Sequence, residues 1–170
     1  MKITLKLVLA IVAIALCSNI SAQNLKLAHI DIQQLVASMP EYDSAMVKFQ
    51  KFYSILENEL EEMRVELNRK YEDFTKNQAN MTDLVKQSRA DELQNIQNRI
   101  QMFQQSAQES IQQEESNLMQ PVYEKATKAI DTVAKDQGIN GVFSAQAFHY
   151  KDASIINLLP AVKQHLGITK

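Results

Sequence analysis

The chain has 170 residues, of which 22% are charged and 45% hydrophobic, and its formal net charge at pH 7 is −2. A mildly acidic chain is a poor overall binder of nucleic acid, because phosphate contacts need clustered Lys and Arg. Cys17 is the single cysteine, so an intramolecular disulfide and a site built from several thiolates are both excluded.

Residues 1–22 have the features of a secretory signal peptide. Lys2 and Lys6 give a positive start, residues 7–16 form an unbroken apolar run, and Ala22 ends a short polar stretch. The apolar run is shorter than the roughly 20 residues that span a membrane. We therefore expect cleavage after Ala22 and export of a soluble mature protein.

Cys17 lies inside this segment. Lipidation would need a small residue just before it, and the bulky Leu16 occupies that place. Cleavage would also remove Lys2 and Lys6 but no acid, which takes the net charge from −2 to −4. The mature chain is thus expected to be free of thiols and mildly acidic.

Residues 25–32 alternate in the manner of a β-strand. Leu25, Leu27 and His29 share one face, whereas Lys26 and Ala28 lie on the other.

Two long apolar stripes with helical spacing follow. Steps of three and four residues are typical of a coiled-coil seam, and the residues between them are mainly Glu, Gln, Lys, Arg and Leu, which favour helices. The first stripe is formed by Tyr42, Met46, Phe49, Tyr53, Leu56, Leu60, Met63, Leu67, Tyr71 and Phe74. The second is formed by Leu93, Ile96, Ile100, Phe103, Ala107, Ile111, Leu118, Val122, Ala126, Ala129 and Val133.

A polar break near Asn80 separates the stripes, so we expect residues 42–118 to form a long antiparallel coiled-coil hairpin. Each half would be about 54 Å long at 1.5 Å per residue. Such an arm is too thin to enclose an active site. Its tip is slightly basic, and a mixed surface solvated by water is a simpler interpretation than a dedicated anion site.

The remaining segments, 23–41 and 119–170, are expected to form a small body. Gly138 should end the second long helix in the left-handed conformation, and residues 141–143 and 147–150 are strand candidates joined by a turn near Ala145. A last helix is expected to have an Asn157 N-cap, Pro160 in its first turn and Gly167 after its end.

This body is too small to bury a self-sufficient core. A three-stranded sheet also has two unpaired edges, which a barrel closed across several chains would remove. We therefore expect the chain to oligomerise through its strands. The candidate interface residues are Leu27, Ile30, Val142 and Phe143.

Nothing in the sequence forms a catalytic or metal site by its spacing. His29 and Asp31 lie on one side of a strand, but His149 and His165 are the only other histidines. The acidic run 57–62 lacks the glycine turn and alternating oxygen ligands of a calcium loop. No Gly-rich phosphate loop and no serine nucleophile motif is present. We expect a protein that is not an enzyme and has no cofactor.

The order of several short motifs resembles the Skp (OmpH-like) family of periplasmic chaperones. The resemblance spans essentially the whole mature chain, and each motif alone is weak. The motifs are Lys26-Leu27-Ala28-His29-Ile30-Asp31, Ser38-Met39-Pro40-Glu41, Gln120-Pro121-Val122-Tyr123-Glu124-Lys125, residues 129–134, residues 138–143 and Leu166-Gly167.

The resemblance implies a mostly α-helical homotrimer with a small β-barrel body and three helical arms, which holds unfolded outer-membrane proteins without ATP. A weak contact between the arm tips and a membrane surface is a further expectation. The arm residues expected to contact such clients are Phe49, Phe52, Met63, Tyr71, Phe74, Met81 and Phe103.

This sequence departs from the family in two respects. Family members are often strongly basic, whereas this mature chain is acidic. In addition, Ile155, Ile156 and Asn157 replace the acid and threonine often found where the last helix begins. The acidic charge argues against electrostatic capture of acidic clients and against lipopolysaccharide binding. The change at residues 155–157 predicts a different start for the last helix.

The same sequence pattern is also compatible with a second function. A structural adaptor of the cell envelope would bind through a fixed apolar patch at the arm tips, whereas a chaperone would spread weak contacts along the arm. Phe74 and Met81 lie near the tip without forming a dense cluster, which favours the chaperone.

Overall fold

The structure, a computed structural model, describes residues 25–168. The expected signal peptide, including Cys17, lies outside the described residues. The elements in chain order are β1 (Leu27–Ile30), α2 (Ile32–Ala37), α3 (Pro40–Asn77), the 3₁₀ helix η1 (Gln78–Asn80), α4 (Asp83–Asp136), β2 (Gly141–Ser144), the 3₁₀ helix η2 (Ala145–Ala147), β3 (Ile156–Asn157) and α5 (Leu159–His165).

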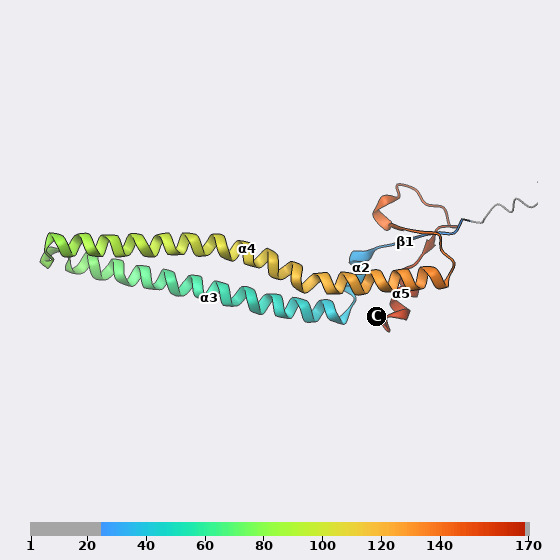
Figure 1. Cartoon of the computed structure of the whole chain (residues 1–170), viewed down its shortest axis with the longest axis horizontal. Helices are drawn as coiled ribbons and strands as arrows, with labels where there is room; N and C mark the ends of the chain where they lie inside the picture. Colours follow the sequence, from blue (N-terminus) through green and yellow to red (C-terminus); the bar gives the residue numbers. More distant parts are fainter. Residues whose placement is uncertain (1–24, 169–170) are drawn as a thin grey trace, which may run out of the picture.

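Two long helices dominate the molecule (Figure 1). Helix α3 has 38 residues and α4 has 54, which corresponds to about 57 and 81 Å. They lie side by side, and the chain reverses direction between them at η1. The part of the pair that projects from the body, residues 42–118, is called the arm below.

Local sequence explains where these helices begin and end. Pro40 occupies the first turn of α3, where its missing N–H leaves no hydrogen bond unmade. The Thr82 hydroxyl caps α4 by accepting a hydrogen bond from the Val85 N–H at 3.4 Å. Gly138 has a φ of 64° just beyond the end of α4, which confirms the predicted left-handed cap.

Helix α4 is not straight. Pro121 lies inside it and lacks the N–H that would bond to the Asn117 carbonyl. Figure 1 shows α4 changing direction in the yellow and orange part that leads to the body. The helix continues beyond this point, so the arm and the body share one continuous element.

A narrow line of apolar contacts and several ion pairs connect α3 to α4. Leu93 and Ile96 on α4 are buried, with 9% and 4% of their surface exposed, while most other residues of the two stripes are half-buried. Within residues 25–168, three ion pairs join the helices, which are Glu41 with Lys125, Glu66 with Arg99, and Lys70 with Glu92. Such exposed pairs each contribute about 1 kcal/mol or less.

The small sheet is parallel, with strand order β2-β1-β3. Helices α2, α3 and α4 make the crossover from β1 to β2, as a parallel connection requires. Leu27 pairs with Gly141 and His29 with Phe143, while Ala28 pairs with Ile156 on the other side of β1. The middle strand of the body is therefore the first strand of the described chain.

The prediction of a strand at 147–150 is wrong. The Ser144 hydroxyl accepts a hydrogen bond from the Gln146 N–H at 3.4 Å, and the chain turns into η2 instead of continuing as a strand. The third strand is formed later, where a turn closed by the Asp152 side chain and the Ser154 N–H, at 2.8 Å, brings Ile156 beside β1.

Helix α5 begins one residue later than the sequence predicts. Its N-cap is Leu158. Asn157 is the residue before this cap, and its side-chain oxygen accepts a hydrogen bond from the Leu159 N–H at 3.1 Å. Pro160 lies in the first turn, and Gly167 follows the end of the helix with a φ of 72°. These last two predictions are confirmed.

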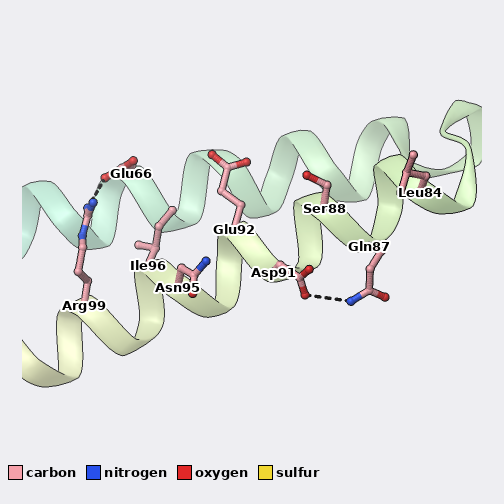
Figure 2. Close-up of a pocket in the computed structure, with 9 residues that line it drawn as sticks. All are labelled: Glu66, Leu84, Gln87, Ser88, Asp91, Glu92, Asn95, Ile96 and Arg99. Atoms are coloured by element: carbon pink, nitrogen blue, oxygen red, sulfur yellow. Dashed lines mark hydrogen bonds and ion pairs between the residues drawn. The ribbon is translucent and has the colours of Figure 1, made fainter.

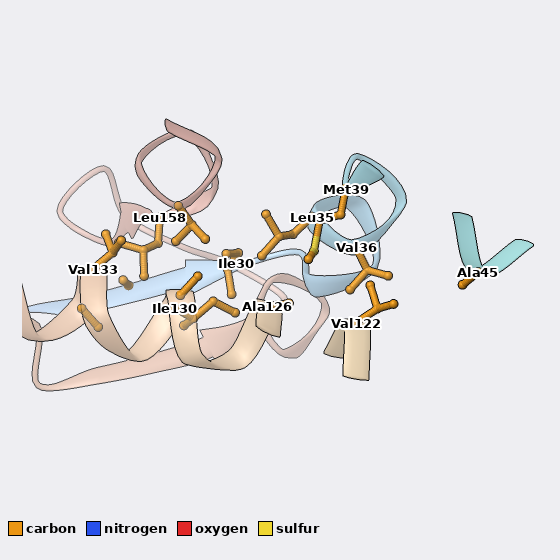
Figure 3. Packing of buried hydrophobic residues seen from close by; sticks show 14 residues of the cluster. Ile30, Leu35, Val36, Met39, Ala45, Val122, Ala126, Ile130, Val133 and Leu158 are labelled. Atoms are coloured by element: carbon orange, nitrogen blue, oxygen red, sulfur yellow. The ribbon is translucent and has the colours of Figure 1, made fainter. Parts of the chain in front are cut away.

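One compact core holds the body together (Figure 3). Helix α4 provides its floor through Val122, Ala126, Ile130 and Val133, and Ile30 of β1 lies directly against it. The other elements cover this floor with Leu35, Val36, Met39, Leu158 and Val162. All these side chains are less than a tenth exposed.

The first prediction concerns the independence of arm and body. Replacing the buried Ile96 by Ala should destabilise the arm by about 2 to 4 kcal/mol, because it leaves a cavity between two helices. Amide hydrogen exchange should accelerate between about Leu60 and Phe103 and remain slow at Val133. The control is Met102→Ala, since Met102 lies on the same helix and is 61% exposed. Uniform acceleration across the chain would show that arm and body unfold together.

Candidate functional site

The residues predicted to bind clients are mostly covered by the arm itself. Tyr71 is 59% exposed. The other six are half-buried, five of them on α3 or α4 and Met81 in the turn between these helices, and they are Phe49, Phe52, Met63, Phe74, Met81 and Phe103. Only part of each of these six side chains could touch another molecule while the arm stays folded.

A second group of apolar side chains is more accessible and was missed from the sequence. All of them except Tyr53, which belongs to the first stripe, fall outside the seam spacing, and isolated apolar residues at such positions carry no periodic signal. They are Val47, Tyr53, Ile55, Val65, Leu84, Val85 and Met102, which are between 41% and 83% exposed. Exposed apolar surface is therefore distributed along the whole arm.

Two grooves lie where the arm meets the body. One has a volume of about 700 Å³ and is lined by Glu41, Lys48, Pro121 and Lys125 among others. The other has a volume of about 720 Å³ and is lined mainly by uncharged side chains. Its lining comprises Tyr42, Met46, Gln112, Glu115, Ser116, Met119, Gln120 and Tyr123.

A third groove, near the tip, is polar and has a volume of about 510 Å³ (Figure 2). Arg99 donates to Glu66 across the two helices at 3.0 Å, and Gln87 donates to Asp91 along α4 at 2.9 Å. The charged side chains Glu66, Glu92 and Arg99 of this groove are therefore already engaged in ion pairs.

Ion pairs also engage much of the basic charge at the tip. Lys76 pairs with Glu72, Lys86 with Asp83, and both Lys70 and Arg89 with Glu92. The two cations beside Glu92 lower the pKa of that carboxyl, Lys70 having the larger effect. Any attraction of the tip to an anionic surface is correspondingly small.

The predicted interface residues lie on two faces of the sheet. Ile30 is 4% exposed and belongs to the core of this chain, and Val142 packs against the same core. Leu27 and Phe143 lie on the opposite face, where a side chain at Gly141 would contact both of them. Phe143 is 47% exposed, so this second face has apolar surface available to a partner.

His29 lies buried on that second face. The Lys151 ammonium group is 2.9 Å from its Nε2, and the ring of Phe148 stands edge-on to both His29 and Phe143. A lysine can only donate, so Nε2 accepts and the Nδ1 atom of the neutral ring bears the proton. That N–H is buried and has no hydrogen-bond partner.

These surroundings oppose a charged imidazole. Burial and the nearby Lys151 charge, in that order, lower the pKa of His29 from its usual 6.5. Among the described residues, the hydrogen-bond partner of the ring is Lys151, and no carboxylate is bonded to either ring nitrogen. Within residues 25–168, no group of three or more His, Cys, Asp or Glu could hold a metal ion, and no helix is long and apolar enough to cross a membrane.

The second prediction follows from the pKa of His29. Because the folded chain binds the proton less readily than the unfolded chain, the free energy of unfolding should fall as the pH drops below about 6.5. The loss cannot exceed about 1.4 kcal/mol per pH unit for one group. Urea unfolding at pH 7.5 and 5.5 measures it.

The control is His29→Gln, whose amide oxygen can still accept from Lys151 but cannot titrate. His149 and His165 remain in both proteins, so the difference between their pH dependences isolates His29. Equal losses of stability in the two proteins would contradict the assignment.

Comparison with known proteins matches this architecture to one family. The family model described as "Outer membrane protein (OmpH-like)" matches residues 26–166, which includes the body and the whole arm. No curated protein matches the chain.

A solved structure from Caulobacter crescentus, provisionally named an outer membrane chaperone (OmpH-like), has the same fold. Its TM-score is 0.75 at 16% sequence identity, and the alignment covers 84% of this chain and 83% of that one. The resemblance noted from the sequence is confirmed, and the chain belongs to the OmpH-like family.

Proposed function

We propose that the chain is an ATP-independent holdase chaperone of the periplasm, which encloses unfolded outer-membrane β-barrel proteins and prevents their aggregation. The observation that carries this proposal is the arm, a two-helix projection with exposed apolar side chains along its whole length. The name of the Caulobacter crescentus protein, an outer membrane chaperone, supports it.

The chemistry of such a client suits this surface. An unfolded β-barrel strand alternates apolar and polar residues and has unpaired backbone groups, so it aggregates through its edges in water. Scattered contacts with exposed side chains such as Tyr53 and Tyr71 would shield apolar side chains without fixing one sequence. Weak contacts of this kind also let the client leave without a nucleotide cycle.

The proposal includes a homotrimer with a small β-barrel at its centre. In the single chain, β2 and β3 are the outer strands of a three-stranded sheet, and unpaired edges favour association. The face that carries Leu27 and Phe143 supplies apolar surface for neighbouring copies. Arms from several copies would then surround one client.

A coiled-coil adaptor that binds through its tips is the second candidate. Leu84 is 83% exposed and Val85 is 41% exposed, and both follow the turn at the tip. Two adjacent apolar residues could anchor one partner. The exposed apolar residues farther along the arm favour the chaperone, because an adaptor that binds through its tips would make no contacts with them.

The third prediction separates these two functions. Deleting residues 60–103 and joining Glu59 to Gln104 should abolish protection of a urea-unfolded outer-membrane β-barrel protein diluted into buffer, measured by light scattering. The full chain should protect it without ATP. Single changes such as Phe49→Ala, Tyr71→Ala or Phe74→Ala should each weaken protection only modestly, since dispersed contacts have no dominant anchor.

The matched tip variant carries Leu84→Asp and Val85→Asp. Its protection should remain near that of the unmodified chain. Complete loss of binding in the tip variant, or full protection by the shortened chain, would instead favour the adaptor. Circular dichroism should verify that both variants are folded.

The fourth prediction concerns assembly. Phe143→Asp should dissociate the trimer, because it buries an unpaired charge at the expected interface, at a cost of several kcal/mol. Mass determination by light scattering tests this. Tyr150→Asp serves as the control, since Tyr150 is 82% exposed and follows the same strand. An unchanged mass for Phe143→Asp would exclude this face as the interface.

A further inference from the structure

The two sides of the arm differ in chemistry where it meets the body. The groove on one side contains Tyr42 and Met46 from α3 and Met119 and Tyr123 from α4. The groove on the other side contains the ion pair of Glu41 with Lys125. One side is therefore aromatic and nearly uncharged, while the other is charged.

The aromatic side continues along α3. Tyr53 and Tyr71 follow Tyr42 by 11 and 29 residues, which places each within about 20° of it on a helix of 3.6 residues per turn. Tyr53 is 43% exposed and Tyr71 is 59% exposed. The charged Arg64 lies between them on the same stripe. Three tyrosines thus follow one side of α3 from the body almost to the tip.

Helix α4 supplies a stripe of glutamines to the same side. Gln112 lines the aromatic groove, and four other glutamines precede it by 4, 7, 11 and 18 residues, within about 40° of it around the helix. All five are exposed, and they are Gln94, Gln101, Gln105, Gln108 and Gln112. This stripe carries no charge over five helical turns.

The ion pairs follow the opposite side. Glu66 and Lys70 come 25 and 29 residues after Glu41, which again places them within about 20° of it. These three residues make all the ion pairs between α3 and α4 found in residues 25–168. The charges of that side are thus engaged in holding the helices together.

We propose that unfolded clients bind to one side of the arm, the tyrosine flank, which consists of the stripe Tyr42, Met46, Tyr53 and Tyr71 on α3 and the five glutamines on α4. This inference rests on the proposed function and adds which surface faces the client. The opposite, ion-paired side faces away from it.

The occupant that suits this flank is an extended, uncharged segment of an unfolded β-barrel protein. A glutamine amide can both donate and accept, so it can pair with the free N–H and C=O groups of an extended backbone. Tyrosine rings cover apolar and aromatic side chains with little loss of conformational freedom. A highly charged segment would lose hydration here and find few counter-charges.

The chain offers a closely matched test. The test variant carries Tyr53→Gln and Tyr71→Gln, which are 18 residues apart on α3. The control carries Val47→Gln and Val65→Gln, which have the same spacing on the same helix but lie about 120° away from the tyrosines. The two valines are 66% and 56% exposed, so the control also removes two accessible apolar side chains.

Affinity for a urea-unfolded outer-membrane β-barrel protein should be measured with the full-length mature chain, by fluorescence titration. The tyrosine variant should bind about tenfold more weakly, since each lost contact costs roughly threefold. The valine variant should stay within about twofold of the unmodified chain. Circular dichroism and the oligomeric mass should be unchanged in both.

Equal losses in the two variants, or a larger loss in the valine variant, would overturn the inference while leaving the holdase function intact. Failure of the unmodified chain to bind the client would overturn the proposed function and this inference with it. The two failures are therefore distinguishable in one experiment.

Discussion

The whole molecule depends on the continuity of α4. Near the tip, Leu93 and Ile96 of this helix bury themselves against α3, and beyond Pro121 its residues Val122 to Val133 form the floor of the body core. One helix of 54 residues therefore supplies a partner for the arm and a base for the sheet. Because no separate linker joins the two parts, the direction of the arm is set by the packing of α4 in the body.

A two-helix arm limits how much apolar surface can be buried. Within the arm each helix packs against one other helix, so side chains such as Tyr71 and Met102 remain largely exposed. In a compact protein these exposed residues would be a liability for aggregation. On a projecting arm they are a surface available to other molecules, as the proposed holdase function requires.

Sequence periodicity predicted the long helices, and local rules predicted the glycine caps at Gly138 and Gly167. Neither periodicity nor local rules predicted β3. A strand of two residues has no measurable alternation, and its pairing with β1 is set by contacts distant in sequence. Most of the client residues predicted from the sequence, such as Phe49, Met63 and Phe103, were chosen from the seam, where helix contact half-buries them. The tyrosine stripe was readable from spacing alone, but the structure was needed to show that ion pairs occupy the other side.

Charge distribution decides how such an arm can attract a client. The expected mature chain carries a net charge of −4, and part of the charge on the arm is paired across or along its helices. Long-range electrostatic attraction between the arm and a client is therefore weak. On the proposed tyrosine flank, the exposed groups of α4 are the uncharged amides of its glutamines. Contacts of amides and aromatic rings act over a few ångströms and are little affected by screening, whereas salt weakens attraction between separated charges. Capture by this arm should thus depend on the area of contact and only slightly on ionic strength, unlike capture by a strongly basic relative.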